Sequence, residues 1–377
     1  MLKAEKVWPI STGRKVTVAV IDSGVDTSHE QLEGAKIAGG ADFLRGNGGG
    51  NGQLDCNGHG TAAASLIAAQ KIEGVGFQGL AYDAKILPIT LSETVDDTEE
   101  TNSEKRTSPE KYARAIDSAV DSGADVINMS LVIRSDVPVL ERAINRALAN
   151  DVVLVAAAGN FDPKEEPPPP PIPASYDGVI GVSAIDRLSR LYKNSQPGEQ
   201  VDLAAPGDGV VVANRGGDHA TLKGADMAAP FVSAAAALVR SRWPELSADE
   251  VARRLFATAS PAPGSHEKVG YGLVDPYRAL TEELSDEPPV EIDGVEVPTL
   301  APEEVARREE WAFGGVLALS TAGVGVVLAG AMLATLTLLP LGHRRKWRPG
   351  RAKPIPEPEE DDMPPAPLRL FEDLEAD

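Results

Sequence analysis

The stretch Val18-Ala19-Val20-Ile21-Asp22-Ser23-Gly24 decides the fold. Its first four residues are apolar, which is typical of a strand that is buried on both faces of a parallel sheet. The aspartate that ends the run then lies at the carboxyl end of the strand. Open α/β sheets hold their functional groups at that edge. We therefore expect an α/β domain whose functional site includes Asp22.

The same pattern continues along the first 280 residues, where apolar strands alternate with amphipathic helices. This alternation predicts a mainly parallel sheet. The expected strands are Val16–Asp22, Lys85–Ile89, Val126–Ser130, Val152–Ala156 and Val179–Ser183. The expected helices are His59–Gln70, Pro109–Ser122 and Val137–Asn150, with later helices beginning near Asp226 and Ser247. Ser247-Ala248-Asp249-Glu250 has the capping-box pattern of a helix start.

Composition limits the classes of function that the chain can have. At 377 residues it is long enough for one large domain or two smaller ones, and its formal charge is −21. Nucleic acid is excluded as a partner, because phosphate binding needs a basic surface. The glycine-rich stretch Gly46–Gly52 lacks the Lys-Ser/Thr of a phosphate-binding loop, so no cofactor is expected.

Two further segments carry residues whose side chains can take part in catalysis. Asn57-Gly58-His59-Gly60-Thr61 places a histidine before an alanine-rich helix, with glycines that leave room around the imidazole. Gly224-Ala225-Asp226-Met227-Ala228-Ala229-Pro230 places a second aspartate at the start of a later helix. Either segment alone is a weak signal, but with Asp22 they form an ordered set.

Together these segments resemble the motifs of subtilases, in the chain order of that family. The resemblance implies a subtilisin-like three-layer fold. It makes Asp22 the orienting acid and His59 the general base. Asn160, in Ala156-Ala157-Ala158-Gly159-Asn160, is then the oxyanion-hole donor. The serine motif G-T-S-M-A-x-P is altered, because Ala225 and Asp226 stand where the family has threonine and the nucleophilic serine.

Within the subtilases the chain is most similar to the mycosins, membrane-anchored proteases of type VII secretion. The similarity rests on Trp8-Pro9-Ile10-Ser11-Thr12-Gly13, on Asp55-Cys56-Asn57-Gly58-His59 and on Leu66-Ile67-Ala68-Ala69-Gln70. An apolar segment near the C-terminus, followed by a basic and then acidic tail, also fits. The resemblance implies type VII secretion components as partners and a peptide or protein ligand in the cleft.

The altered serine motif bears on activity. Histidine activates a hydroxyl by removing its proton, and an ionised carboxylate has none. Removal of the serine from subtilisin lowers kcat about 10⁶-fold. We therefore expect a pseudoprotease that acts as a scaffold or binds peptides. The alternative is an active serine endopeptidase with a displaced nucleophile, Ser23 or Ser233; Ser233, two helical turns beyond Asp226, is expected to face elsewhere.

His59 is expected to lie between two carboxylates, those of Asp22 and Asp226. Neighbouring negative charges favour the protonated imidazole, so the sequence predicts an Asp–His⁺–Asp cluster. Two carboxylates and one imidazole can also bind a divalent ion, but nothing else in the sequence supports a metal site. We therefore expect no metal.

The C-terminal part predicts a membrane span. No charged residue occurs from Trp311 to Gly342, and roughly 20 apolar residues suffice to cross the hydrocarbon core. We expect a transmembrane helix at 311–341, joined to the 1–280 domain by an acidic, proline-rich linker at 281–310. Basic residues follow the span, so the positive-inside rule places the 342–377 tail in the cytoplasm and the large domain outside the cell membrane.

The N-terminus disagrees with that orientation. Met1–Pro9 has no apolar core and is not expected to be a signal peptide. Two alternatives stay open: the true start lies upstream of Met1, or the span tail-anchors a cytosolic pseudoprotease. The single cysteine, Cys56, allows no intramolecular disulfide and is expected to be a partly buried free thiol. The proline run Pro167–Pro171 predicts a stiff loop near the cleft.

Overall fold

The computed structural model describes residues 2–45, 47–92, 107–134, 137–161 and 170–284, together with Met332. The chain divides into two compact units, Met1–Val297 and Pro298–Asp377, and the elements below all belong to the first. No helix within the described residues is long and apolar enough to span a membrane. The predicted linker, span and tail lie largely outside those residues, as does most of the proline run.

Within the described residues, the core of the first unit is an eight-stranded sheet with the order β2-β4-β1-β5-β6-β7-β8, with β3 paired to β4. Every pair in this sheet is parallel, as the alternation of strands and helices predicts. The strands are β1 Thr17–Asp22, β2 Lys36–Ile37, β3 Ala41–Asp42, β4 Lys85–Thr90, β5 Val126–Met129, β6 Val153–Ala157, β7 Val179–Ile185 and β8 Leu203–Pro206.

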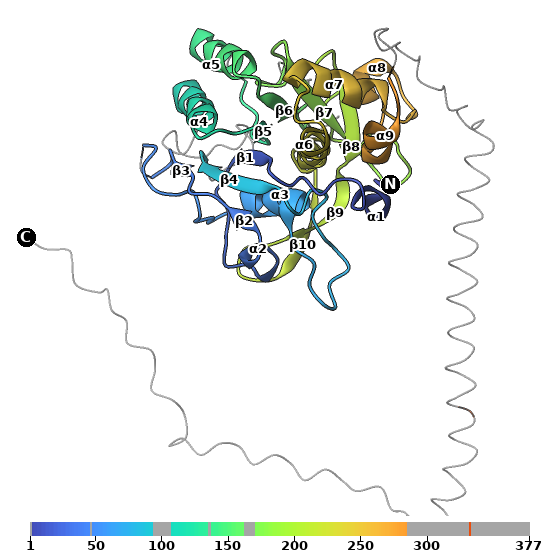
Figure 1. Ribbon diagram of the computed structural model, residues 1–377, viewed down its shortest axis with the longest axis horizontal. Coiled ribbons are helices and arrows are strands. Elements are labelled where there is room, and N and C mark those ends of the chain that lie inside the picture. Colours follow the sequence, from blue (N-terminus) through green and yellow to red (C-terminus); the bar gives the residue numbers. More distant parts are fainter. Residues whose placement is uncertain are drawn as a thin grey trace, which may run out of the picture. The chain divides into compact units, whose positions relative to one another are not determined.

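Helices cover both faces of the sheet, and β1 shows why. Val18 and Val20 point into the core cluster that includes α3 and α6, whereas Ala19 and Ile21 point into the cluster with α4 and α5. A strand with apolar residues on both faces needs cover on both, and the result is a three-layer fold. Figure 1 shows α4 and α5 together, separated by strands from α6. These helices are α3 His59–Ala68, α4 Pro109–Asp121, α5 Pro138–Ala149 and α6 Ala225–Arg242.

Shorter elements complete the described part of the unit. The capping box of α7 forms as expected: Ser247 Oγ accepts from Glu250 N at 3.3 Å, and Glu250 Oε2 accepts from Ser247 N at 2.7 Å. An antiparallel hairpin, β9–β10, pairs beside α3 rather than with the main sheet. The bounds are α1 Ala4–Val7, α2 Glu30–Glu33, α7 Ala248–Ala257, α8 His266–Val269, α9 Pro276–Thr281, β9 Asp208–Ala213 and β10 His219–Lys223.

Helix α6 carries a proline in its interior, and a polar network on β5 compensates for it. Pro230 has no N–H, so it cannot donate to the carbonyl of Asp226 four residues earlier. The hydroxyl of Ser130 donates to that carbonyl instead, at 3.2 Å. Asn128 Nδ2 donates to Ser130 Oγ at 2.9 Å and accepts, through Oδ1, from Ser233 Oγ at 2.9 Å. This network fixes the first turns of α6 against the end of β5.

Candidate active site

Asp22 ends β1 at the carboxyl edge of the sheet, as the sequence predicts. Its side chain is completely buried, and Oδ1 accepts a hydrogen bond from Ser23 N at 2.7 Å. Asn160 follows β6 at the same edge, because both strands are parallel to β5. The parallel sheet therefore brings an acid and an amide from distant parts of the sequence to one side of the molecule.

His59 is the first residue of α3 and faces Asp22. Its Nδ1 lies 2.8 Å from Oδ1 and 2.9 Å from Oδ2 of that carboxylate. Gly60 permits this approach, since a Cβ at that position would collide with the backbone oxygen of Gly24. Gly58 adopts a φ of 99°, which L side chains rarely adopt. The glycines on either side of His59 thus leave the room that the sequence analysis expects.

Asp226, in the first turn of α6, joins the other two groups. Its Oδ2 lies 2.8 Å from His59 Nε2, and its Oδ1 accepts from Asn160 Nδ2 at 2.7 Å. Asn160 in turn accepts from Ala225 N at 2.9 Å, so the amide is held from both ends. An added Cβ on Gly224 would collide with Asp226 Oδ1. The four residues singled out from the sequence therefore meet in one hydrogen-bonded chain.

In this hydrogen-bonded row of side chains, the central charged group is His59, which is 7% exposed. Burial alone would lower its pKa, but the charges and hydrogen bonds of Asp22 and Asp226 outweigh burial and raise the pKa well above its ordinary value. These neighbours therefore favour the protonated imidazole. This agrees with the Asp–His⁺–Asp cluster that the sequence predicts.

Asp55 organises the turn before His59, a role that the sequence analysis missed. Its Oδ1 accepts from Ser23 Oγ at 2.9 Å, Asn57 N at 3.0 Å and Gly58 N at 2.7 Å. Its Oδ2 accepts from Thr61 N at 2.9 Å and Thr61 Oγ1 at 2.5 Å. One buried carboxylate thus links the turn after Asp22 to the start of α3. The only hint in the sequence was an acid four residues before the histidine.

Neither serine considered as a displaced nucleophile reaches His59. Ser233 is buried and donates to Asn128 Oδ1, on the side of α6 that faces β5, as expected. Ser23 is also buried; its hydroxyl donates to Asp55 and accepts from Gly60 N at 2.9 Å. Both hydroxyl groups have structural partners, while His59 Nε2 is paired with Asp226.

Cys56 corrects one expectation. The thiol is exposed rather than partly buried, and Arg45 Nη2 donates to its Sγ at 3.1 Å. The reason is local: Asp55 turns inward to accept the next backbone amides, so the adjacent side chain points outward. Within the described ranges, no group of three or more His, Cys, Asp or Glu side chains is arranged to hold a metal ion.

Comparison with known proteins agrees with this geometry. The model of the Subtilase family matches residues 13–272. Subtilisin DY of Bacillus licheniformis is 34% identical over 276 residues, which cover 73% of this chain and 94% of that protein. Mycosin-3 of Mycobacterium tuberculosis is 32% identical over an alignment 397 positions long, which covers 90% of this chain and 82% of the mycosin.

Solved structures show the same likeness in three dimensions. The crystal structure of MycP1 from Mycobacterium smegmatis superposes with a TM-score of 0.66 at 30% identity, covering 79% of this chain and 87% of that one. The structure of MycP3 protease from the type VII (ESX-3) secretion system gives a TM-score of 0.62 at 32% identity, covering 75% and 87%. The chain, with its subtilisin-like α/β fold, therefore belongs to the Subtilase family.

Proposed function

We propose that this chain is a mycosin-like pseudoprotease that serves as a scaffold or peptide-binding component of a type VII secretion apparatus. One observation carries the proposal. The carboxylate of Asp226, at the position where the subtilase serine motif has its nucleophile, is hydrogen-bonded to both His59 Nε2 and Asn160 Nδ2. The groups that would activate a serine and stabilise an oxyanion are both engaged by this one side chain.

Three requirements of serine proteolysis are affected together. Asp226 offers no hydroxyl proton for a base to remove. The raised pKa of His59 favours its protonated form, which cannot accept another proton. The amide of Asn160 donates to the side chain of Asp226, which leaves it unavailable to a developing oxyanion. Each of these three effects alone would lower proteolytic activity, and all three result from Asp226.

The alternative function is an endopeptidase with a displaced nucleophile. The contacts of Ser23 and Ser233 disfavour this alternative. Both hydroxyl groups are buried, and both are hydrogen-bonded to side chains other than the imidazole. Labelling with a reagent that modifies activated serines distinguishes the two functions directly.

The place of action is also part of the proposal. Similarity to mycosins supports type VII secretion, since one MycP1 that resembles this chain is described as an essential component of the type VII (ESX-1) secretion system. We assign 1–280 to the subtilase domain, 281–310 to a linker, 311–341 to a transmembrane helix and 342–377 to a tail. The charge pattern favours an extracytoplasmic domain and a cytoplasmic tail.

A fluorophosphonate probe tests the inactive state. We expect no labelling of the wild-type chain. Asp226→Ser places a hydroxyl beside His59 Nε2 and removes one of the two carboxylates that keep the imidazole protonated, so this variant is expected to become labelled. The Asp226→Ser/His59→Ala double variant is the matched control and should lose the label. Labelling of the wild type that depends on His59 would overturn the pseudoprotease.

Complementation tests the scaffold role separately. In a strain that lacks this protein, type VII secretion should be restored equally by the wild type and by the His59→Ala variant, because a scaffold needs no general base. A variant that folds but fails to restore secretion would show that the chemistry of His59 is needed. The measurement is the amount of secreted substrate in the culture medium, with protein levels checked in parallel.

A further inference from the structure

A cavity of about 280 Å³ lies under helix α7, at the edge of the sheet opposite to Asp22 and Asn160. It opens where β6 and β7 begin and where Asp202 precedes β8, so it is at the amino ends of the strands. The candidate active site is at their carboxyl ends. The cavity is therefore separate from that site, by roughly the 17–20 Å length of a typical strand.

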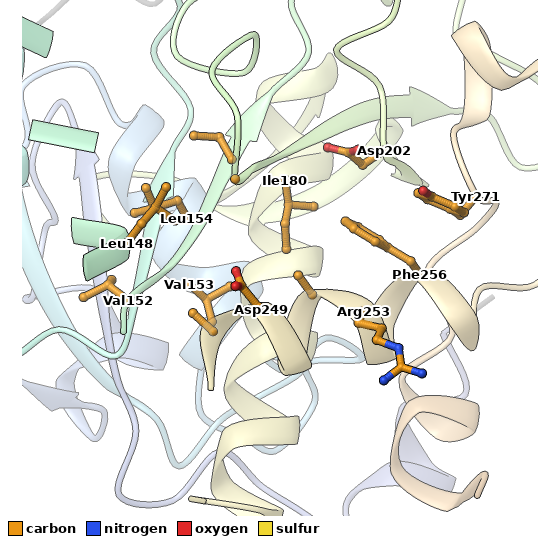
Figure 2. A pocket seen from close by; sticks show the side chains of 14 residues that line it. Leu148, Val152, Val153, Leu154, Ile180, Asp202, Asp249, Arg253, Phe256 and Tyr271 are labelled. Atoms are coloured by element: carbon orange, nitrogen blue, oxygen red, sulfur yellow. The ribbon is translucent and has the colours of Figure 1, made fainter. Parts of the chain in front are cut away.

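The walls of the cavity are mostly apolar. Val153, Leu154 and Ile180 of the sheet are at most 2% exposed and form its floor. Phe256 and Tyr271 form one side, with their rings stacked at 4.8 Å and an interplanar angle of 13°. Figure 2 shows these two rings beside each other, with Ile180 between them and Leu154.

One acidic group, Asp202, enters this apolar space from the end of the sheet, and a second, Asp249, lines it from α7. Its backbone is fixed by hydrogen bonds to Gly181 O at 2.9 Å and from Tyr271 N at 2.8 Å. Its Oδ2 accepts from Gly181 N at 2.8 Å, and no donor among the described residues is bonded to Oδ1. Figure 2 places the carboxylate at the upper side of the cavity, near Tyr271 and above Ile180. One carboxylate oxygen thus remains for a ligand.

Other charged groups around the cavity do not neutralise this carboxylate. Asp249 and Arg253 lie on the α7 side, and the guanidinium of Arg253 points away from the other labelled side chains in Figure 2. Burial raises the pKa of Asp202 to about 6, and Gly181 N–H and His266 oppose that rise. Above that pH the fold holds a negative charge in a largely apolar place, which is costly without a cation.

We propose that the cavity under α7 binds a small organic ammonium ion, with its apolar body on Ile180 and its ammonium group on Asp202. The stacked faces of Phe256 and Tyr271 suit both an apolar body and a neighbouring cation. An anion is disfavoured, because two carboxylates line the space. The volume is at the small end of the range for ligand sites, which suits a molecule with a single ring.

A second cavity of about 640 Å³ adjoins the first and provides a route to it. The two share Gly178, Val179 and Asp202, so the carboxylate stands at their junction. The walls of the second cavity are more polar and include the stretch from Gln196 to Gln200. A cation that arrives through this wetter space passes Asp177 and Glu199 of its wall and meets Asp202 at the junction, and its apolar part then enters the space under α7.

The test uses the full chain with 2-phenylethylamine and, as a neutral ligand of the same shape, 2-phenylethanol. We expect the amine to bind in calorimetry or NMR titration about tenfold more tightly than the alcohol, because only the amine pairs with the carboxylate. Asp202→Asn should reduce amine binding about tenfold and bring it to the level of the alcohol. Asp208→Asn, which removes a charge beyond the other end of β8, should leave binding unchanged.

A second variant, Ala252→Leu, tests whether the ligands bind in the cavity under α7. Ala252→Leu fills the space from the α7 wall and should abolish binding of both ligands while the thermal unfolding temperature is maintained. The proposal is overturned if the amine does not bind, if amine and alcohol bind equally, or if Asp202→Asn or Ala252→Leu leaves binding intact. None of these outcomes depends on the activity of the site at His59.

Discussion

His59 is the residue whose chemical state decides what the candidate active site can do. Asp22 and Asp226 each lie 2.8 Å from one of its ring nitrogens, and together they raise its pKa well above the ordinary value. A raised pKa leaves less of the imidazole in the neutral form that can accept a proton near neutral pH. The charge instead joins two buried carboxylates that would repel each other without it.

The state of His59 can be measured by NMR titration of its imidazole. We expect the wild-type ring to remain protonated well above pH 6.5, and Asp226→Asn to lower its pKa because one carboxylate is lost. Glu245→Gln, an exposed charge change beyond the far end of α6, should have no effect. A ring that is neutral well below pH 6.5 would contradict the cluster.

The raised pKa of His59 also has a consequence for stability. A folded-state pKa above the unfolded value means that the folded chain holds the proton more tightly. The stabilisation is therefore complete below the unfolded pKa of about 6.5 and is lost as the pH rises through the folded pKa. Urea unfolding of the wild type and of Asp226→Asn over this range should show a smaller pH dependence in the variant.

The raised pKa of Asp202 has the opposite effect on stability: it destabilises the folded chain where the carboxylate is ionised. Its pKa is raised to about 6, so the folded chain disfavours its ionised form. This penalty is absent below the unfolded pKa of about 3.9 and complete above the folded value. We expect Asp202→Asn, which keeps an acceptor for Gly181 N, to raise the free energy of unfolding at pH 8 by about 2 kcal/mol, and by much less at pH 4. Urea unfolding at the two pH values checks this; equal effects at both would contradict it.

The residues of the site were predictable to different degrees. The resemblance to subtilases was enough to expect that Asp22, His59, Asn160 and Asp226 meet, and the order of the motifs along the chain agreed with it. The role of Asp55 was not predictable, since its partners are three backbone amides and two hydroxyl groups whose directions depend on the folded turn. The exposure of Cys56 was predicted wrongly for the same reason.

At the scale of elements, strong periodicity gave reliable boundaries. The predicted strands and helices of the first 280 residues agree with β1, β4–β7 and α3–α5 to within two residues at each end. Short or exposed elements escaped prediction, above all the β9–β10 hairpin, where β10 alternates between exposed and half-buried residues. Only tertiary contacts stabilise such strands, and a single sequence does not reveal them.

The proline in α6 allows an element-level test. Ser130→Ala should lower the free energy of unfolding by about 2 kcal/mol, because it leaves the buried carbonyl of Asp226 without a donor. In a Pro230→Ala background the new backbone N–H can donate to that carbonyl, so the same change should cost less. A double-mutant cycle in urea measures the difference; equal costs in both backgrounds would show that Ser130 acts otherwise.

At the scale of the whole molecule, the family follows from the sheet, its helices and the matched residues 13–272. Orientation across a membrane is a separate question that the charge pattern alone addresses. We expect a protease added to intact cells, with the outer layers permeabilised, to degrade the 1–280 domain but not the 342–377 tail. Epitope tags at each end report the outcome, and a protected domain would instead favour tail-anchoring from the cytosol.

The carboxylate of Asp226, which bridges His59 and Asn160, resembles the carboxylate product of proteolysis bound in an active site. We expect a carboxylate newly formed by proteolysis to engage the same two groups that Asp226 engages, His59 Nε2 and Asn160 Nδ2. Boronic acids and peptide aldehydes imitate the tetrahedral intermediate and need a hydroxyl and a vacant amide, so this chain should resist them. Removal of the internal carboxylate in Asp226→Ser should create sensitivity to both inhibitors.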